Sequence, residues 1–486
     1  NNEEFEKILE NIDENGPAPA EEPERQYYFM KKCRQWAEEE KERIGHPLTM
    51  SIQTLGCQMN AKDSEKMTAI LEYIGYKEVE EPVADFVLYN TCTVRENANL
   101  KIYGRLGYLK NHKKKNPSMK IALCGCMMQE ADEVERIRKS YSFVDLVFGT
   151  HNIYKLAELL YTQVQSARPV MDVWKEAKEI VEDLPGKRKY PFKTGVNIMY
   201  GCNNFCTYCI VPYVRGRERS REPQAIEQEF RQLVQAGYKE IMLLGQNVNS
   251  YGKTLENPIT FSELLRRLDR IEGDYRIRFM SPHPKDATPE LFETMANSKH
   301  IAHSLHLPLQ AGNNRVLKAM NRNYTREQFL ELVEQARAVM PDITFTTDLI
   351  VGFPGETYEE FLDTVDMLEK VKFNSLYTFI YSPRVGTRAA SMPDEISAEE
   401  KSRWFQELWK KQEEVVAKTS PAMIGTTQRV LVQGYNEKQT MLWGKTEGNM
   451  NCEFEGDDSL IGTFVNVKIT ESPNFVLKGT LITEEL

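Results

Sequence analysis

The sequence predicts an α/β multidomain protein with three folded parts in succession. A chain of 486 residues is too long for one ordinary domain. Two separate stretches alternate apolar strands with amphipathic helices, whereas the last stretch contains only short alternating strands. We therefore expect an N-terminal α/β domain with a parallel sheet, a partial barrel of six βα repeats, and a small antiparallel β-barrel resembling an OB fold.

The hydrophobic content and the number of cysteines indicate a folded protein of a reducing compartment. Hydrophobic residues make up 41% of the chain, no apolar run approaches the ~20 residues of a membrane span, and no signal segment opens the sequence. The nine cysteines are too sparse for a disulfide scaffold, and clustered cysteines in a reducing compartment bind metal or do chemistry more often than they form bridges. We expect a cytoplasmic protein without a membrane partner.

The net charge of -10 does not exclude nucleic acid as a partner, because the charge is unevenly distributed. Residues 1–48 carry -6 and residues 423–486 carry -4, so the body between them is neutral. That body holds two basic clusters, KNHKKK at 110–115 and RGRERSR at 215–221.

The first alternation predicts that three distant cysteines meet. After an acidic, helix-forming extension at 1–48, the domain at 49–165 has strands at 48–54, 84–90 and 119–124. Cys57, Cys92 and Cys126 each follow one of these strands. Since the carboxyl ends of parallel strands share one edge, where ligands bind, we expect the trio to converge there.

The second alternation occupies 191–420, after a linker at 166–190. Its six strands are expected at 195–200, 240–244, 276–280, 304–309, 343–352 and 375–381. The loop GCNNFCTYC at 201–209 follows the first strand, which places Cys202, Cys206 and Cys209 at the active end of the barrel. The barrel expected at 421–486 belongs to a class that often binds oligonucleotides.

The spacing C-x3-C-x2-C provides three metal ligands and no fourth. A structural zinc site requires four ligands in closed geometry, and the next cysteine along the chain is Cys452. Three thiolates on a [4Fe–4S] cluster leave one iron open, and that iron can bind a small amine and carboxylate ligand. The alternative is a zinc or electron-transfer site.

This loop resembles that of the radical S-adenosylmethionine (SAM) enzymes, and six βα repeats agree with their partial barrel. The resemblance implies that the open iron binds SAM and that an electron from the cluster cleaves it to methionine and a 5′-deoxyadenosyl radical. It also implies that GFPG contacts adenine through Gly352, Pro354 and Gly355, and that Gln246 stands where the family has an acidic residue for the methionine amine. Further candidate SAM contacts are Ser281 and Gln310, which follow other strands, and Asp348. Ordinary hydrogen bonding at the barrel mouth is the alternative for these polar side chains.

A preceding α/β domain with its own cysteine trio resembles the radical SAM methylthiotransferases, which carry a second cluster and a C-terminal TRAM barrel. The resemblance covers nearly all of residues 49–486. It is carried by TLGCQMNAKDSEKM (54–67), NTCTVRENA (90–98), CGCMMQ (124–129) and CTYCIVPYVRGRERSR (206–221), whose wording is most similar to the MiaB-type branch. Cys57, Cys92 and Cys126 would hold the auxiliary cluster, while Cys33, Cys124 and Cys452 are interpreted as packing residues.

The resemblance implies methylthiolation of C2 of N6-dimethylallyladenosine at position 37 of tRNA. One SAM would methylate a sulfur on the auxiliary cluster, and a second would give the radical that removes hydrogen from the adenine, so the six cluster cysteines are the catalytic candidates. The implied partners are a tRNA anticodon stem-loop, an electron donor and a sulfur donor, and we expect a monomer. Candidate RNA contacts are Asn60, Asp63, Glu65, Arg215, Arg217, Arg219 and Arg221. Helix capping at the first three, and a solvated, ion-paired segment at the arginines, are the alternatives.

Two other functions stay open at this point. The same chemistry could act on threonylcarbamoyl-adenosine in tRNA or on an aspartate of a ribosomal protein. The acidic C-terminal barrel favours a protein or another basic partner over tRNA. A non-catalytic, metal-containing RNA-binding protein is the alternative from another class.

Overall fold

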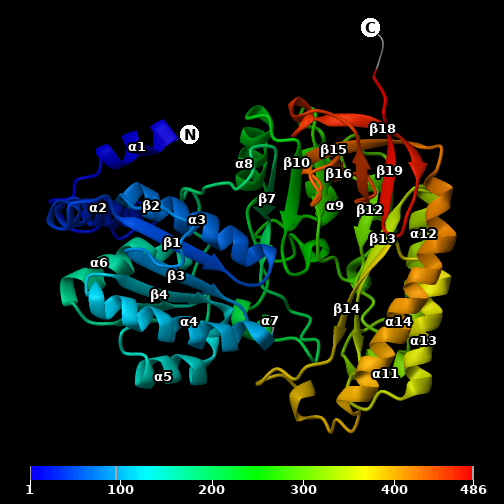
Figure 1. Ribbon diagram of the computed structural model, residues 1–486, viewed down its shortest axis with the longest axis horizontal. Coiled ribbons are helices and arrows are strands. Elements are labelled where there is room, and N and C mark those ends of the chain that lie inside the picture. The colour runs from blue at the N-terminus through cyan, green and yellow to red at the C-terminus, as the bar shows by residue number, and fades with distance from the viewer. Residues whose placement is uncertain (1, 94–95, 484–486) are drawn as a thin grey trace. The chain divides into compact units, whose positions relative to one another are not determined.

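The structure of the chain is a computed structural model that describes residues 2–93 and 96–483, with the backbone alone at 96–99. It divides into two compact units (Figure 1): Asn1–Lys189 with Ile210–Arg217, and Tyr190–Cys209 with Glu218–Leu486. The first unit is the predicted α/β domain, and the second contains both the six-stranded half barrel and the C-terminal β-barrel. The predicted fold class is confirmed.

The first unit is built on a six-stranded parallel sheet with the order β2-β1-β3-β4-β5-β6. Its strands are β1 (Thr49–Thr54), β2 (Lys77–Glu78), β3 (Phe86–Thr91), β4 (Lys120–Gly125), β5 (Leu146–Phe148) and β6 (Val170–Asp172). The three long central strands match the predicted ones. The three outer strands have only two or three residues, which is too short for a recognisable pattern of apolar residues.

Helices cover both faces of this sheet (Figure 1). One face carries α1 (Asn2–Glu10), α2 (Glu24–Ile44), α3 (Gln58–Ile74) and α6 (Leu156–Ser166), and the other carries α4 (Glu96–Lys115) and α5 (Ala131–Ser140). Strand residues alternate between the two apolar cores: Phe86 and Leu88 face the first set of helices, and Val87 and Tyr89 face the second. A sheet covered on both faces explains why β3 is buried throughout.

The N-terminal segment belongs to this domain rather than preceding it. Helix α2 buries Tyr27, Phe29, Met30 and Cys33 in the same core as the strands. The Cys33 thiol lies 3.3 Å from the carbonyl oxygen of Ala157, as a packing residue would. Strand β6 likewise extends the sheet into the stretch expected to be a linker, so the first unit is longer at both ends than the expected domain at 49–165.

The second unit contains two parallel three-stranded sheets, β7-β10-β11 and β12-β13-β14. The strands are β7 (Lys193–Asn197), β10 (Glu240–Leu244), β11 (Arg276–Phe279), β12 (Ser304–His306), β13 (Thr344–Val351) and β14 (Ser375–Ile380). All six expected strands are therefore present. A parallel bridge between Ile277 and Ile301 links the two three-stranded sheets. The first expected strand breaks after Asn197, and β8 (Met199–Tyr200) pairs instead with the antiparallel β9 (Arg219–Ser220).

The barrel helices follow their strands, and each of them except α8 has a side chain that caps its N-terminus. They are α8 (Pro223–Gln235), α9 (Phe261–Asp269), α10 (Pro289–Ala296), α11 (Asn314–Ala319), α12 (Arg326–Val339), α13 (Tyr358–Val371) and α14 (Ala398–Thr419). Thr325 and Thr357 begin α12 and α13 with complete capping boxes, which satisfy free N–H groups of the first turn. Among the described residues, no helix is long and apolar enough to cross a membrane.

Residues from 427 onward form a closed five-stranded barrel with the order β15-β16-β17-β19-β18. Its strands are β15 (Thr427–Tyr435), β16 (Leu442–Lys445), β17 (Asn451–Phe454), β18 (Phe464–Glu471) and β19 (Val476–Leu481). Strand β17 has only four residues, and its Cys452 is fully buried in the barrel core.

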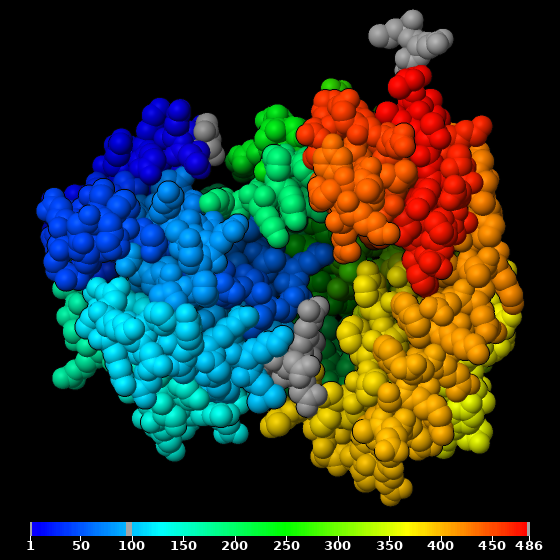
Figure 2. All heavy atoms as spheres, in the orientation of Figure 1, coloured from blue at the N-terminus to red at the C-terminus, as the bar shows by residue number. Residues whose placement is uncertain are grey.

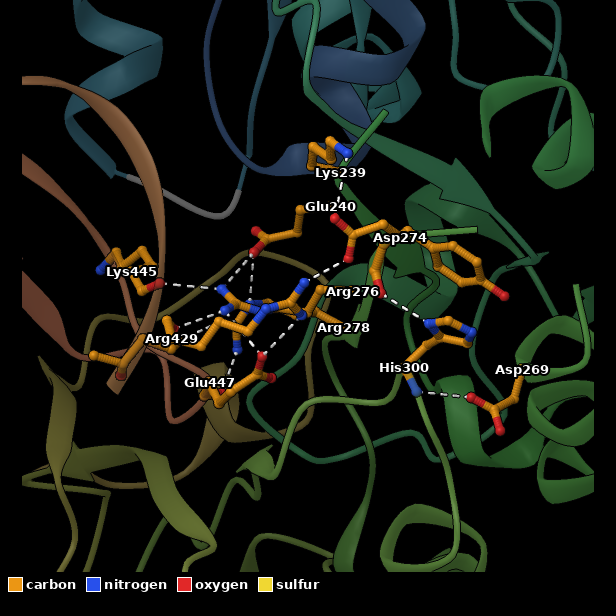
Figure 3. A network of polar contacts seen from close by, with 12 residues as sticks. Lys239, Glu240, Asp269, Asp274, Arg276, Arg278, His300, Arg429, Lys445 and Glu447 are labelled. Carbon is orange, nitrogen blue, oxygen red and sulfur yellow. Dashed lines mark hydrogen bonds and ion pairs between the residues drawn. The ribbon is translucent and has the colours of Figure 1, made fainter. Parts of the chain in front are cut away.

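This small barrel packs against the N-terminal ends of the half-barrel strands (Figure 3). Arg276, the first residue of β11, donates to the carbonyl oxygen of Lys445 at 3.1 Å, and Arg278 donates to that of Glu447 at 3.0 Å. Glu240, the first residue of β10, accepts from Arg278 at 3.0 Å. The cysteine loop follows the opposite, C-terminal end of this sheet, away from these contacts.

Candidate active site: two cysteine trios

The first trio converges at the carboxyl edge of the parallel sheet, where it was expected. Cys57 occupies the N-cap position of α3, Cys92 directly follows β3, and Cys126 opens a short 3-10 helix after β4. The sulfur atoms of Cys57 and Cys126 both lie 3.9 Å from Oδ1 of Asn60. Burial raises the pKa of the Cys126 thiol, and negative charge on Cys57 or Cys92 raises it further, because the three thiols lie close together.

Two glycines allow the trio to pack this closely. Gly56 has a φ of +102°, and a side-chain Cβ there would lie 2.8 Å from the sulfur of Cys92. Gly125 has a φ of +94°, and its Cβ would lie 2.4 Å from the carbonyl oxygen of Thr91. Because both positions combine left-handed backbone with a close approach, no other residue fits them without displacing its neighbours.

A buried arginine lies beside this trio. Arg215 ends the short helix α7 (Val211–Arg215), which packs against Cys126 in the first unit. Its guanidinium donates to Oδ2 of Asp63 at 2.9 Å and to Oδ1 of Asn60 at 2.6 Å. Burial raises the pKa of Cys126 to about 11, and the positive charge of Arg215 opposes that rise.

The expected RNA contacts on α3 lie inside this network. Asn60 is fully buried and donates to the carbonyl oxygens of Leu55 and Thr91. Asp63 is buried against Arg215, and Glu65 pairs with Lys62 at 2.5 Å. None of the three caps the helix through a side-chain hydrogen bond, so side-chain capping does not account for them, and their contact with RNA stays a prediction. Asn60 and Asp63 instead position the side chains around the cysteines.

The second trio lies on the loop after β8, held by the segment 319–324. The backbone N–H of Asn204 points at the sulfur of Cys202 at 3.5 Å, and burial raises the pKa of Cys202 to about 11. The Thr207 hydroxyl donates to the carbonyl oxygen of Ala319 at 2.9 Å. Asn321 donates to the carbonyl oxygens of Asn204 and Phe205. These bonds fix a loop that has no regular secondary structure of its own.

Sequence reasoning missed Arg322, which lies on that same segment. Its Nη1 is 3.4 Å from the sulfur of Cys206, and the side chain is buried. The only signal in the sequence was a basic residue in a short stretch between two helices, which is too common a feature to indicate a role.

The expected SAM-contacting residues lie just beyond the C-terminal ends of the half-barrel strands, except Asp348, which lies within β13. Gln246 accepts from the backbone N–H of Gly201 at 2.7 Å, so it holds the start of the cysteine loop. Asp348 pairs with His306 at 3.3 Å. Ser281 and Gln310 both have left-handed backbone, with φ of +65° and +69°, which non-glycine residues adopt mainly where surrounding structure or function demands it.

The segment from Gly352 to Glu356 turns back on the chain itself. Gly352 and Gly355 have φ of +75° and +81°, and Pro354 between them is buried. A Cβ on Gly352 would lie 2.5 Å from the side chain of Lys401 of α14, whereas Gly355 has open space around it. The close approach that Gly352 permits is therefore to α14, and a contact of this segment with adenine stays a prediction.

Buried polar atoms without partners mark the same end of the half barrel. Within the described part of the chain, both side-chain atoms of Asn197, Oδ1 of Asn247 and Nε2 of His283 lack a hydrogen bond. These residues follow or end β7, β10 and β11. Since buried polar groups are nearly always satisfied, their arrangement fits a polar ligand such as an amino acid or nucleoside.

The four arginines after the cysteine loop have different environments. Arg215 and Arg221 are buried, and Arg221 donates to Glu229 at 2.8 Å and to the carbonyl oxygen of Asn197 at 2.6 Å. Arg217 is exposed, and Arg219 of β9 is half-buried over the ring of Tyr200. Burial contradicts the solvated-surface alternative for Arg215 and Arg221, and the contact of the four arginines with RNA stays a prediction.

The donor chemistry of both trios fits iron–sulfur clusters. Within the described ranges, no group of three or more His, Cys, Asp or Glu side chains is arranged around a single metal ion. Three soft sulfur donors match the ligand set of such clusters.

Three family models match the chain: the Radical SAM superfamily at residues 196–368, the Uncharacterized protein family UPF0004 at 49–149, and the TRAM domain at 421–482. A relative from Lachnoclostridium phytofermentans named tRNA-2-methylthio-N(6)-dimethylallyladenosine synthase is 54% identical, over 93% of this chain and all of the relative. One of the same name from Clostridioides difficile is 49% identical, over 96% of this chain and 98% of the relative. Among solved structures, the radical SAM methyltransferase TsrM from Kitasatospora setae matches with a TM-score of 0.49 at 14% identity, over 70% of this chain and 75% of TsrM.

Proposed function

Because this chain belongs to the tRNA-2-methylthio-N(6)-dimethylallyladenosine synthase family of radical SAM enzymes, we propose that it attaches a methylthio group to tRNA. The proposed position is C2 of N6-dimethylallyladenosine at position 37, next to the anticodon. The chain is a transferase that uses SAM and [4Fe–4S] clusters, as its family does. SAM supplies both the methyl group and the radical needed to activate an adenine C–H bond that no acid or base can deprotonate.

The presence of two separate cysteine trios carries this proposal. Each trio lies at the carboxyl edge of a parallel sheet, and each has one buried arginine beside it. We assign Cys57, Cys92 and Cys126 to an auxiliary cluster and Cys202, Cys206 and Cys209 to the cluster that binds SAM. A single trio would suffice for radical formation alone, whereas two trios fit a reaction that also delivers sulfur.

The C-terminal end of the half barrel is the proposed SAM site. Asn197, Asn247 and His283 present buried polar atoms without partners in the described chain. Burial lowers the pKa of His283 to about 2, so its ring is neutral. Because Nδ1 accepts from the backbone N–H of Lys285 at 3.1 Å, the free Nε2 carries the ring hydrogen and can donate one hydrogen bond. Ser281, Gln310 and Asp348 contribute from neighbouring strand ends, with Asp348 oriented by His306.

One face of β14 offers a wall for the substrate base. Tyr377 and Phe379 are 49% and 53% exposed, although both are large aromatic residues. They pair in register with Asp348 and Ile350 of β13, and the ring of Tyr377 lies 5.6 Å from that of His306, so an aromatic strip runs beside the proposed SAM site. Aromatic side chains stack on splayed-out RNA bases, and an apolar wall suits a dimethylallyl group.

The basic face of α4 is proposed as a further contact for the RNA backbone, in addition to the arginines that follow the cysteine loop. Lys110, Lys114 and Lys115 are exposed on this helix, and none pairs with a carboxylate among the described residues. Tyr108 is 54% exposed on the same helix. Figure 2 shows this cyan segment at the surface of the first unit. Lysines without carboxylate partners, next to an exposed aromatic ring, fit a phosphate backbone even though the whole chain is acidic.

Further partners follow from the reaction. The substrate is proposed to bind through its anticodon stem-loop, with the C-terminal barrel as a second RNA-binding part, and the enzyme is proposed to act as a monomer. Cleavage of SAM needs a one-electron donor, and methylthiolation needs a sulfur donor. The proposed place of action is the cytoplasm, where tRNA is present and thiols stay reduced.

Nucleoside mass analysis of tRNA from cells that lack the gene tests the proposal. The expected result is loss of methylthio-isopentenyladenosine and accumulation of isopentenyladenosine, with methylthio-threonylcarbamoyl-adenosine unchanged. Loss of the threonylcarbamoyl product, or of the aspartate modification on a ribosomal protein, would assign the chemistry to another acceptor. No change in any of them would contradict the proposal.

Cysteine variants separate the two trios in vitro. After anaerobic reconstitution, Cys209→Ala should abolish SAM cleavage, whereas Cys92→Ala should still cleave SAM but insert no sulfur. Cys124→Ala is the matched control, since that thiol is buried against Met67 at 3.7 Å and is not assigned as a ligand. Methylthio product from Cys92→Ala would refute the auxiliary assignment, and bound zinc in place of iron would favour the non-catalytic alternative.

A further inference from the structure

Arg322 has an unusual set of partners for a buried cation. Its side chain is 4% exposed, and its three nitrogens are all engaged. Nη2 donates to the carbonyl oxygen of Pro308 at 2.7 Å, Nε to the Tyr324 hydroxyl at 3.0 Å, and Nη1 to the sulfur of Cys206 at 3.4 Å. No carboxylate pairs with it in the part of the chain that the structure describes.

A guanidinium stays charged in proteins, so burying it without an anion is strongly unfavourable. Of its three partners, the carbonyl oxygen and the hydroxyl are neutral. The Cys206 sulfur becomes an anion when it ligates iron, because metal binding removes the thiol proton. The arrangement therefore becomes balanced in charge only with a thiolate at Cys206.

The orientation of Arg322 is fixed by its surroundings. The Tyr324 hydroxyl that accepts from Nε donates in turn to the carbonyl oxygen of Leu309 at 2.6 Å. The segment carrying Arg322 is bound to the cysteine loop through Asn321 and through Thr207. The distance between the guanidinium and the sulfur is thus set by the fold rather than by a mobile side chain.

We propose that Arg322 is a positioning residue that makes the cluster at Cys202, Cys206 and Cys209 easier to reduce. Reduction adds one electron, and so one negative charge, to the cluster. A fixed positive charge and an N–H···S bond stabilise that added charge in a low-dielectric site, and both raise the reduction potential of an iron–sulfur cluster. The electron comes from a low-potential one-electron donor and is passed on to SAM. This inference rests on the proposed assignment of a cluster to that loop.

Other charges around the loop do not take the place of Arg322. Beyond burial, Glu218 and Lys285 act on Cys202 with opposite effects on its pKa. His283 is kept neutral chiefly by burial, and the charges of Arg322 and Lys285 lower its pKa further. Replacing Arg322 by a neutral side chain therefore removes one positive charge from beside Cys206.

A redox titration followed by electron paramagnetic resonance tests the proposal. The full-length chain with Cys57, Cys92 and Cys126 all changed to Ala holds only the cluster in question, which isolates its reduced signal. In this background, Arg322→Gln should make the cluster at least tenfold harder to reduce. For a one-electron couple, this lowers the midpoint potential by about 59 mV or more. Arg322→Lys keeps the positive charge, so its midpoint potential should lie between that of the background chain and that of Arg322→Gln.

Arg326→Gln is the matched control. Arg326 lies four residues further on but pairs with Asp366 at 2.6 Å, so its removal should leave the potential unchanged. An unshifted or more positive potential in Arg322→Gln would overturn the inference. So would loss of iron from both Arg322 variants with Arg326→Gln intact, because that outcome assigns Arg322 a purely structural role. A background chain that takes up no iron would overturn the cluster assignment itself, which is the separate failure of the proposed function.

Discussion

Changing Asp63 to Asn removes the counter-charge of Arg215 while keeping the size of the side chain. In the native chain the two side chains are 6% and 5% exposed, and Nη1 of Arg215 lies 2.9 Å from Oδ2 of Asp63. Asn60 accepts a second bond from the same guanidinium at 2.6 Å. An amide at position 63 can still accept a hydrogen bond, but it leaves the buried positive charge uncompensated.

The expected cost follows from that burial. Breaking a buried ion pair by removing one partner destabilises a protein by about 3–5 kcal/mol, because the remaining charge is desolvated without compensation. At about 2–4 °C per kcal/mol for a unit of about 150–250 residues, this corresponds to a fall of about 6–20 °C in the midpoint of thermal unfolding. The metal-free chain is the appropriate sample, since a cluster at Cys126 would provide Arg215 with another anion.

Thermal unfolding combined with hydrogen exchange measures this effect in the correct unit. Because the chain has several folded parts, protection of β3 and β4 identifies the transition that belongs to the first unit. Arg215→Met should cost less than Asp63→Asn, and the double variant should cost less than the sum, with a coupling of about 0.5–3 kcal/mol. Glu6→Gln is the control, since its pair with Arg34 is 41% and 31% exposed and should be worth less than about 1 kcal/mol. A loss in Asp63→Asn no larger than in this control, or strictly additive losses, would refute the reasoning.

Three further predictions concern surfaces and interfaces. Deleting residues 1–44 should expose the core under α2 and abolish hydrogen-exchange protection in α6, since each large apolar side chain uncovered costs about 1.5–3 kcal/mol. Unchanged protection of α6 would mean that the segment is dispensable. Changing Lys110, Lys114 and Lys115 together to Glu should weaken tRNA binding and reduce the slope of log K against log salt by about 2–3. Lys418→Glu on α14 is the control, and equal slopes in both variants would contradict the RNA contact. Glu240→Gln leaves Arg276 and Arg278 with less compensation and should lower stability by about 3 kcal/mol, measured by thermal unfolding and by release of residues 421–486 in limited proteolysis. No change in either measurement would rule out a stabilising role for this network (Figure 3).

The long helices and strands could be predicted because apolar residues recur in each of them at the regular spacing of a helix or a strand. Strands β1, β3 and β4, and the six half-barrel strands, were found within a few residues of their observed bounds. Placement of both trios followed from topology, since the carboxyl ends of parallel strands lie at one edge. Short strands such as β5 and β17 were not predicted, because three or four residues are too few to show a pattern of apolar residues. Only their pairing with neighbouring strands defines them.

The side-chain environment of the site was not predictable to the same degree. Arg215 and Arg322 are both basic residues in irregular or short segments, and such residues are mostly solvated. Their burial depends on carbonyl oxygens, a hydroxyl and sulfur atoms brought from remote parts of the chain. The acidic partner of Arg215 could not be predicted either. In the sequence, Asp63 is an ordinary carboxylate near a helix start, and only the fold places Arg215 against it.

The arginines beside the two trios differ in whether a carboxylate balances their charge. This difference affects which of the two proposed clusters an incoming electron reduces. Arg215 already has a carboxylate partner in Asp63, so it adds little net positive charge beside Cys126. Arg322 has no such partner among the described residues, so its full charge acts on Cys206. Since reduction adds negative charge, the environment of the second trio favours an incoming electron more than that of the first. A chain with two clusters and one SAM-cleaving site needs such a bias, because an electron held on the auxiliary cluster cannot cleave SAM.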